Sequence, residues 1–150
     1  PDLPADEWQS AMLVRANSVH KALLMHPWAT QAIVSRINIG PNNLAYIDKT
    51  VGCLIKAGFS IEMADHIWNA LDSHIYGFTL QELNFPLQEN EYAEAATGFI
   101  DMIPADKYPH MNALTTHVMQ GKYNGIHDFE FGLMLLLNGL DQVQRSMKSS

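Results

Sequence analysis

The chain has 150 residues, the size of one ordinary domain, and its composition of 47% hydrophobic and 17% charged residues excludes an intrinsically disordered chain. Its single cysteine, Cys53, excludes an internal disulfide bond and favours a reducing compartment, so we expect a cytoplasmic protein. The net charge is −7 at pH 7 and the nine Lys and Arg residues form no basic patch, which argues against a chain that binds DNA by itself, because such binding depends on neutralising phosphates.

The amino-terminal part of the chain predicts a short tail followed by two helices. Residues 1–5 form the expected tail, and because they contain neither an initiator Met nor a signal peptide, we expect the chain to be part of a longer protein. The first helix is predicted from about Ala5 or Asp6 to His26. Pro27 both ends it and starts a short second helix that reaches about Ser35 or Arg36. Arg15 lies within the apolar stripe of the first helix, whose other members are Trp8, Ala11, Met12, Val19, Ala22 and Leu23.

The middle of the chain predicts two more helices, separated by a turn at Gly58. Asn42 is a suitable cap for the third helix, Gly58 supplies its left-handed end with Phe59 folding back, and Ser60 caps the fourth helix. Helical phase predicts that the third helix buries Leu44, Ile47, Val51, Leu54 and Ile55. The fourth helix, expected over about residues 61–83, has a main apolar stripe formed by Ala64, Ile67, Trp68, Leu71, Ile75 and Phe78. A second apolar patch on the same helix, which indicates a contact with a partner, is formed by Tyr76, Leu80 and Leu83.

The remaining part of the chain predicts three further helices. The fifth is expected over about residues 88–103, before Pro104, and packs through Tyr92, Ala95, Ala96, Phe99 and Ile103. A short helix follows over about residues 109–120, and the last helix is predicted over about residues 128–145. The last helix is apolar nearly all round, with Phe131 and Leu135 lying outside a stripe formed by Phe129, Leu133, Leu136, Leu140 and Val143. Another subunit is the simplest cover for this surplus, and Gly132 and Gly139 would let a neighbouring helix approach closely.

These elements predict an all-α fold, in which residues 6–150 form one orthogonal bundle of about six to seven helices. The sequence contains no convincing strand-like alternation and no hairpin dipeptide. Its most apolar stretch, residues 129–140, is interrupted by Glu130 and Asn138 and is shorter than the ~20 residues that a membrane helix needs. We therefore expect no membrane partner.

Common signatures of catalysis and metal binding are missing from the sequence. There is no nucleophile elbow, phosphate-binding loop or dinucleotide fingerprint, and the seven histidines form no HExxH pattern. We therefore expect no catalytic residue, no metal and no cofactor. Asp65, Asn69 and Asp72 flank Trp68 and could do acid and base work, but acids on the surface of a helix are the commoner explanation.

Arg15 is the most informative polar residue, because a guanidinium within an apolar stripe needs either a partner or a route to water. One interpretation is that the side chain extends along the surface until its head group reaches solvent. The other is that Arg15, Asp72 and Trp68 face a shared cavity between the first, third and fourth predicted helices. Mostly apolar walls with a few convergent polar groups are typical of a small-ligand pocket.

Five landmarks occur in a characteristic order along the chain. They are the segments 22–28 (ALLMHPW), 40–42 (GPN), 57–60 (AGFS), 71–78 (LDSHIYGF) and 129–133 (FEFGL). With these segments, residues 6–145 resemble the carboxy-terminal domain of the tetracycline-repressor (TetR/AcrR) family. The AGFS turn before the long helix and the FEFGL opening of the last helix carry most of the specificity.

The resemblance implies the sensing and dimerisation part of a transcription regulator, expected to be a repressor that a small organic effector releases from DNA. Operator DNA is expected as a partner only through an amino-terminal helix-turn-helix domain, which this chain lacks. Two helices of each subunit form a four-helix bundle at the dimer interface of this family, and here they match the fourth and last helices. The expected interface residues of this homodimer are Tyr76, Leu80, Leu83, Gly132, Leu136, Gly139 and Leu140. Helical phase and the family correspondence together predict a ligand-binding set of Arg15, Val19, Ile47, Thr50, Val51, Leu54, Trp68, Asn69 and Asp72.

The resemblance does not extend to the residues with which the founding member of the family binds tetracycline and magnesium. Histidine, threonine, glutamine and glutamate serve there, whereas the nearest positions here are Ile33 or Val34, Arg36 or Ile37, Thr50 and Gln81. We therefore expect a different effector, organic and partly apolar, that needs no metal. A helical protein-interaction module without a ligand and a small helical enzyme remain the alternatives.

Overall fold

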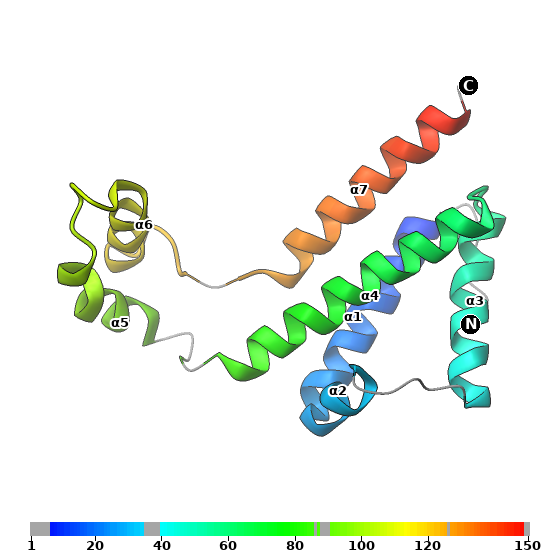
Figure 1. Cartoon of the computed structure of the whole chain (residues 1–150), viewed down its shortest axis with the longest axis horizontal. Helices are drawn as coiled ribbons and strands as arrows, with labels where there is room; N and C mark the ends of the chain where they lie inside the picture. Colours follow the sequence, from blue (N-terminus) through cyan, green and yellow to red (C-terminus); the bar gives the residue numbers. More distant parts are fainter. Residues whose placement is uncertain (1–6, 35–39, 86, 88–90, 126, 149–150) are drawn as a thin grey trace. The chain divides into compact units, whose positions relative to one another are not determined.

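The computed structural model describes residues 7–34, 40–85, 87, 91–125 and 127–148 (Figure 1). Four predicted features lie outside these ranges: the tail at residues 1–5, the start of the first helix at residue 5 or 6, the end of the second at residue 35 or 36, and the start of the fifth at residue 88. The described part of the chain is helical and contains no strand, which confirms the all-α prediction. Its helices are α1 (Trp8–Met25), α2 (Pro27–Val34), α3 (Pro41–Lys56), α4 (Ile61–Asn84), α5 (Tyr92–Phe99), a short 3-10 helix η3 (Ile100–Met102), α6 (Pro109–Met119) and α7 (Phe129–Lys148).

The chain divides into two compact units, with boundaries after Leu83 and after Asp128. The main unit contains α1 to α4 and α7, and the inserted unit, residues 84–128, contains α5, η3 and α6. Within the main unit α7 runs antiparallel to α4 (Figure 1). No described helix combines the length and the apolar character needed to cross a membrane.

The turn between α3 and α4 follows the sequence-based prediction closely. Gly58 has a φ of 101°, and the N–H groups of Gly58 and Phe59 donate to the carbonyls of Ile55 (2.9 Å) and Leu54 (3.2 Å). These two hydrogen bonds close the carboxy-terminal end of α3. The Ser60 hydroxyl then accepts a hydrogen bond of 3.2 Å from the N–H of Met63 and caps α4.

The predicted cap of α3 at Asn42 is wrong. Gly40 is the residue before the helix, and Pro41 occupies its first turn. Proline suits that position because its φ is already helical and the first turn leaves the amide without an intrahelical partner. The helix therefore starts two residues earlier than a cap at Asn42 would place it, and Asn42 lies inside it.

The core of the main unit joins α1, α3, α4 and α7. Its largest fully buried apolar side chains are Met12, Leu54, Ile67, Leu71, Ile75, Leu133 and Leu137. Burying one such side chain stabilises a fold by roughly 1.5 to 3 kcal/mol. The carboxy-terminal end of α3 is also held by α7, because the Gln144 amide donates to the carbonyl of Ala57 at 2.6 Å.

Parts of the predicted apolar stripes on α3 and α7 are exposed. Leu44 is 50% exposed and Ile55 42%, because α3 turns Thr50, Cys53 and Leu54 inward instead. On α7, Val143 is 39% exposed, since the buried positions are Phe129, Leu133, Leu137 and Gln144. Ala22 of α1 is exposed as well. The spacing predicted the helices correctly, whereas packing decided their rotation.

The inserted unit is built from short helices that pack through their apolar faces. The rings of Phe85 and Tyr92 stack with centroids 5.4 Å apart, and the Asn112 amide donates to the carbonyl of Ile103 at 2.7 Å. The predicted contact residues of the fifth helix line one hollow of about 400 Å³ together with Leu114 and Val118 of α6; these residues are Tyr92, Ala95, Ala96, Phe99 and Ile103.

Candidate functional site

A cavity of about 440 Å³ lies between α1 and α3. One helical stripe from each helix lines it, because the lining positions follow one another at intervals of three and four residues. The volume is within the range of pockets that hold drug-sized molecules. The lining residues are Ala11, Val14, Arg15, Ser18 and Val19 of α1, and Asn42, Ala45, Tyr46, Lys49 and Thr50 of α3.

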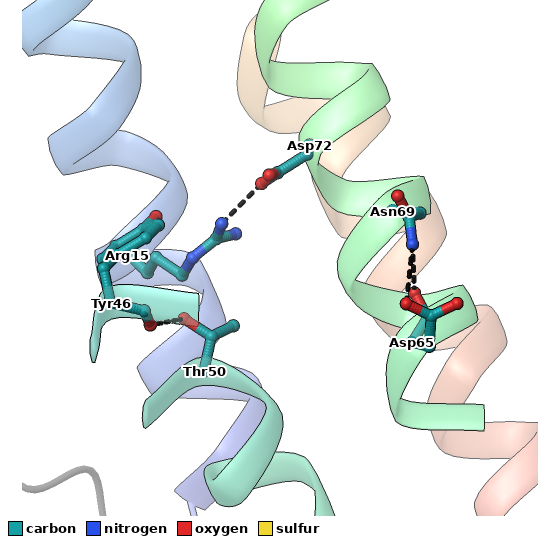
Figure 2. A network of polar contacts seen from close by, with 6 residues as sticks. All are labelled: Arg15, Tyr46, Thr50, Asp65, Asn69 and Asp72. Atoms are coloured by element: carbon teal, nitrogen blue, oxygen red, sulfur yellow. Dashed lines mark hydrogen bonds and ion pairs between the residues drawn. The ribbon is translucent and has the colours of Figure 1, made fainter. Parts of the chain in front are cut away.

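Arg15 stands at the centre of the polar contacts around this cavity. Its side chain is only 5% exposed, and its Nη2 donates to Asp72 Oδ1 at 2.5 Å (Figure 2). Its guanidinium carbon also lies 5.0 Å from the centre of the Tyr46 ring, a cation–π contact. Arg15 therefore connects α1 to both α3 and α4.

Three donor groups near the cavity are buried without an acceptor among the described residues: Arg15 Nε, Arg15 Nη1 and the Tyr46 hydroxyl. We call them the unpaired donors. A buried donor that is left unsatisfied costs about 1 to 3 kcal/mol, and more when it is charged. Folded proteins contain few such groups, so three of them on two residues that line one cavity are a feature that packing within the described chain does not explain.

The Tyr46 hydroxyl is protonated at neutral pH and can act as a donor. Burial raises the pKa of Tyr46, and the Arg15 guanidinium opposes that rise by favouring the ionised phenol. Arg15 also approaches the Tyr46 hydroxyl closely enough to lower its pKa slightly by hydrogen bonding, but no hydrogen bond of good geometry joins the two side chains. The carbonyl of Tyr46 accepts a bond of 3.0 Å from the Thr50 hydroxyl, which occupies the only hydrogen of that hydroxyl.

The structure brings part of the predicted ligand-binding set together. Arg15, Val19 and Thr50 line the cavity, and Asp72 reaches it through its ion pair with Arg15. The interpretation in which Arg15 extends to solvent is excluded by the burial of its side chain.

The other members of that set do not line this cavity. Leu54 is fully buried in the core, and Ile47 and Val51 are half-buried. Trp68 is also half-buried, and its indole N–H is buried without an acceptor in the described part of the chain. Asn69 is exposed, and its amide donates to the backbone carbonyl and side chain of Asp65 (Figure 2).

Tyr46 and Lys49 also line the cavity, although neither belongs to the ligand-binding set predicted from the sequence. The sequence does contain a pattern that indicates this face. Asn42, Tyr46 and Thr50 recur at every fourth position, which places one polar residue per turn on a single face of α3. This face was not predicted to line the cavity because Leu44 and Ile55 were expected to be buried, and burying them would turn a different face of α3 toward its neighbours.

The carboxylates of α4 that could do acid and base work, Asp65 and Asp72, have different partners. Asp72 is paired with Arg15, whereas Asp65 accepts from Asn69. His74 and His20 contact Phe129, with ring centroids at 5.1 Å and 4.0 Å. Across the described ranges, no three His, Cys, Asp or Glu side chains gather closely enough to hold a metal ion.

The residues expected at a dimer interface lie on α4 and α7, and their side chains differ in how far they are buried within the single chain. Tyr76, Leu136 and Leu140 are partly buried against the core, and Leu80 and Leu83 are half-buried. Gly132 faces His74 of the same chain, whereas a Cβ at Gly139 would meet no described atom within 4 Å. The side chains of Phe131 and Leu135 are 66% and 60% exposed.

A comparison with protein families matches residues 1–144 to the family described as "Tetracyclin repressor-like, C-terminal domain". The match covers nearly the whole chain, and the helical fold of the described residues agrees with it. The chain belongs to this family, which is a regulatory type of domain. Searches of curated proteins and of solved structures returned no match.

Proposed function

We propose that this chain senses a small organic effector for a TetR-type transcription regulator, and that the cavity between α1 and α3 is the effector site. The observation that carries this proposal is the set of unpaired donors beside a mostly apolar cavity of about 440 Å³. A domain that served only as an interaction module would have no need of such a site. A buried donor without an acceptor is costly, so a ligand whose acceptor atoms reached these donors would gain that free energy on binding.

Signal transfer follows from the position of Arg15 in this proposal. Arg15 touches Tyr46 on α3 and Asp72 on α4, so a ligand at its guanidinium acts on three helices at once. A ligand shifts a conformational equilibrium by its difference in affinity for the two states. The regulator is a repressor in this proposal, and the effector selects the state in which the amino-terminal domain no longer reads its operator.

The regulator is also proposed to be a homodimer, joined by α4 and α7. The partly exposed apolar side chains on α7, including Phe131 and Leu135, supply surface for a symmetric contact. The net charge of −7 agrees with a domain that leaves DNA binding to another part of the protein. A cytoplasmic location, and the lack of catalytic activity, metal and cofactor, belong to the same proposal.

A cavity-filling variant tests the effector site. A library of small organic molecules is screened against the chain by ligand-observed NMR, and each hit is repeated with Ala45→Trp, whose indole fills the cavity. Ala93→Trp is the matched control, because Ala93 is an exposed helical alanine of α5. We expect hits that bind the unmodified chain and the control but not Ala45→Trp. If every hit binds all three proteins equally, the cavity is not the effector site.

A further inference from the structure

We propose that the effector is an amphipathic organic acid, in which an apolar body carries one carboxylate that binds Arg15 and Tyr46. This inference rests on the proposed effector site and adds the chemical class of its ligand. The unpaired donors all offer hydrogen atoms, so the missing partner is a hydrogen-bond acceptor. A carboxylate has two oxygens with about four acceptor positions and can serve several donors together.

The charge balance around the cavity favours an anion with a single charge. The ion pair with Asp72 compensates the charge of Arg15. Lys49 adds one further positive charge to the lining, and no carboxylate is among the lining residues. A monoanion would neutralise this excess, whereas a cationic ligand would meet Arg15 and Lys49 as like charges.

The hydroxyl groups of two other lining residues, Ser18 and Thr50, are not available to donate to a carboxylate, because each already donates to a backbone carbonyl. The Ser18 hydroxyl donates to the carbonyl of Val14 at 2.7 Å, and the Thr50 hydroxyl donates to that of Tyr46. Because each hydroxyl has one hydrogen, the donors that remain belong to Arg15, Tyr46, Lys49 and the amide of Asn42. The strongest of these are the charged groups.

The apolar half of the ligand is required by the rest of the wall. Ala11, Val14, Val19 and Ala45 line the cavity with the ring of Tyr46. A small inorganic anion would leave this surface wet, while an aromatic or alkyl body would remove it from water. The cavity therefore matches an acid with an aromatic or alkyl body better than a free phosphate or sulfate.

Matched acids and alcohols test the head group by isothermal titration calorimetry at neutral pH. The probes are biphenyl-4-carboxylate with biphenyl-4-methanol, and decanoate with decan-1-ol, so that each pair shares its body. We expect one or both acids to bind at least ~10-fold more tightly than the matching alcohol, which corresponds to about 1.4 kcal/mol. Higher salt should weaken the acid more than the alcohol, because the excess charge is partly exposed.

Variants identify the donors. Tyr46→Phe removes only the hydroxyl and should weaken acid binding by ~5- to 10-fold while changing alcohol binding by less than ~2-fold. Lys49→Gln should weaken the acid and flatten its salt dependence. Tyr108→Phe and Lys107→Gln are the controls, since both residues are exposed in the inserted unit.

The role of Arg15 needs a paired substitution, because removing it alone would leave Asp72 without its cation. The double variant Arg15→Met with Asp72→Leu removes both charges together, and circular dichroism verifies that it folds. It should bind each acid no more tightly than the matching alcohol.

The possible outcomes separate this inference from the function beneath it. Alcohols that bind as tightly as their acids, with Ala45→Trp still blocking them, would overturn the acidic ligand and leave the effector site standing. Binding of the acids that is unchanged in Tyr46→Phe and in the double variant would also overturn it. If no probe binds, the acidic ligand is overturned, and the library screen alone decides the effector site. If Ala45→Trp changes the binding of no ligand, both proposals fail.

Discussion

At the scale of single residues, the ion pair of Arg15 and Asp72 shows how a charge is kept inside a small helical unit. Arg15 is nearly buried, with 5% of its side chain exposed, and Asp72 retains 17%. A buried pair adds little net stability by itself, because desolvation offsets the attraction, but losing one member leaves an uncompensated charge. The two residues therefore depend strongly on one another.

Removing the carboxylate of Asp72 should be costly. Asp72→Ala is expected to lower the free energy of unfolding by about 2 to 3 kcal/mol, below the largest values for broken buried pairs because Asp72 is partly exposed. Urea denaturation followed by circular dichroism measures the change. Asp65→Ala, at an exposed acid of the same helix, should cost less than about 1 kcal/mol. Equal losses in both variants would contradict a special role for the pair.

Tyr76 provides a prediction at high pH. Burial, with a smaller effect of the Asp72 carboxylate, raises the pKa of Tyr76 to about 12, whereas an unfolded tyrosine has a pKa of ~10. Between these values the unfolded chain releases this proton and the folded chain keeps it, so stability falls as the pH rises from about 10 to 12. Absorbance at 295 nm should show a late phase that Tyr76→Phe removes. Unfolding curves at pH 9 and pH 11.5 should show that the variant loses less stability over this range.

At the scale of helices, α4 and α7 approach closely at Gly132. A Cβ added there would lie 2.5 Å from Cε1 of His74. His74 has little freedom to yield, since its Nε2 contacts the carbonyl of Phe129 at 2.9 Å and its ring stacks on that residue. The glycine is thus required by packing within one chain.

Two glycines of α7 should respond oppositely to alanine. Gly132→Ala should destabilise the main unit by about 1 to 3 kcal/mol, as overpacking usually does. Gly139→Ala meets no described atom within 4 Å, so within a single chain the better helix propensity of alanine should stabilise it by about 0.5 to 1 kcal/mol. Thermal unfolding at low protein concentration compares the two variants, and a Gly132→Ala variant as stable as the parent would rule out the tight contact with His74.

At the scale of the whole molecule, the division into two units and the surplus apolar surface of α7 bear on assembly. The inserted unit has its own hollow and its own helix contacts. The main unit contains the core, the cavity and both helices of the proposed interface. Dimerisation is therefore a property to be sought in the main unit.

We expect the unmodified chain to sediment as a dimer at tens of micromolar. Stable interfaces of this kind commonly bury ~2,000 Å² or more in total. Gly139→Leu should weaken the dimer, because a large side chain would separate helices that cross at that position. Phe99→Leu, an exposed position of the inserted unit, should leave the association constant unchanged. A chain that stays monomeric at this concentration would exclude the interface.

The sequence alone determined the class of fold, the family and most helix positions, because these depend on local chemistry. Three- and four-residue spacing, Pro27 and the Gly58 turn act over one or two turns of chain, and the order of the five landmarks carries the family. The placement of Arg15 within a buried stripe could also be predicted, since all the residues concerned lie on one helix.

Only the tertiary structure decided which faces of the helices meet. The exposure of Leu44 and Ile55 and the place of Tyr46 in the cavity depend on the rotation of α3 against α1. Arg15 and Asp72 are separated by 57 positions, and Arg15 and Tyr46 meet only across two helices. A helix with apolar residues on several sides can pack with any of those sides against the core. Its rotation about its own axis is therefore set by the shape and charge of the neighbouring helices, and the spacing of residues along one helix does not contain that information.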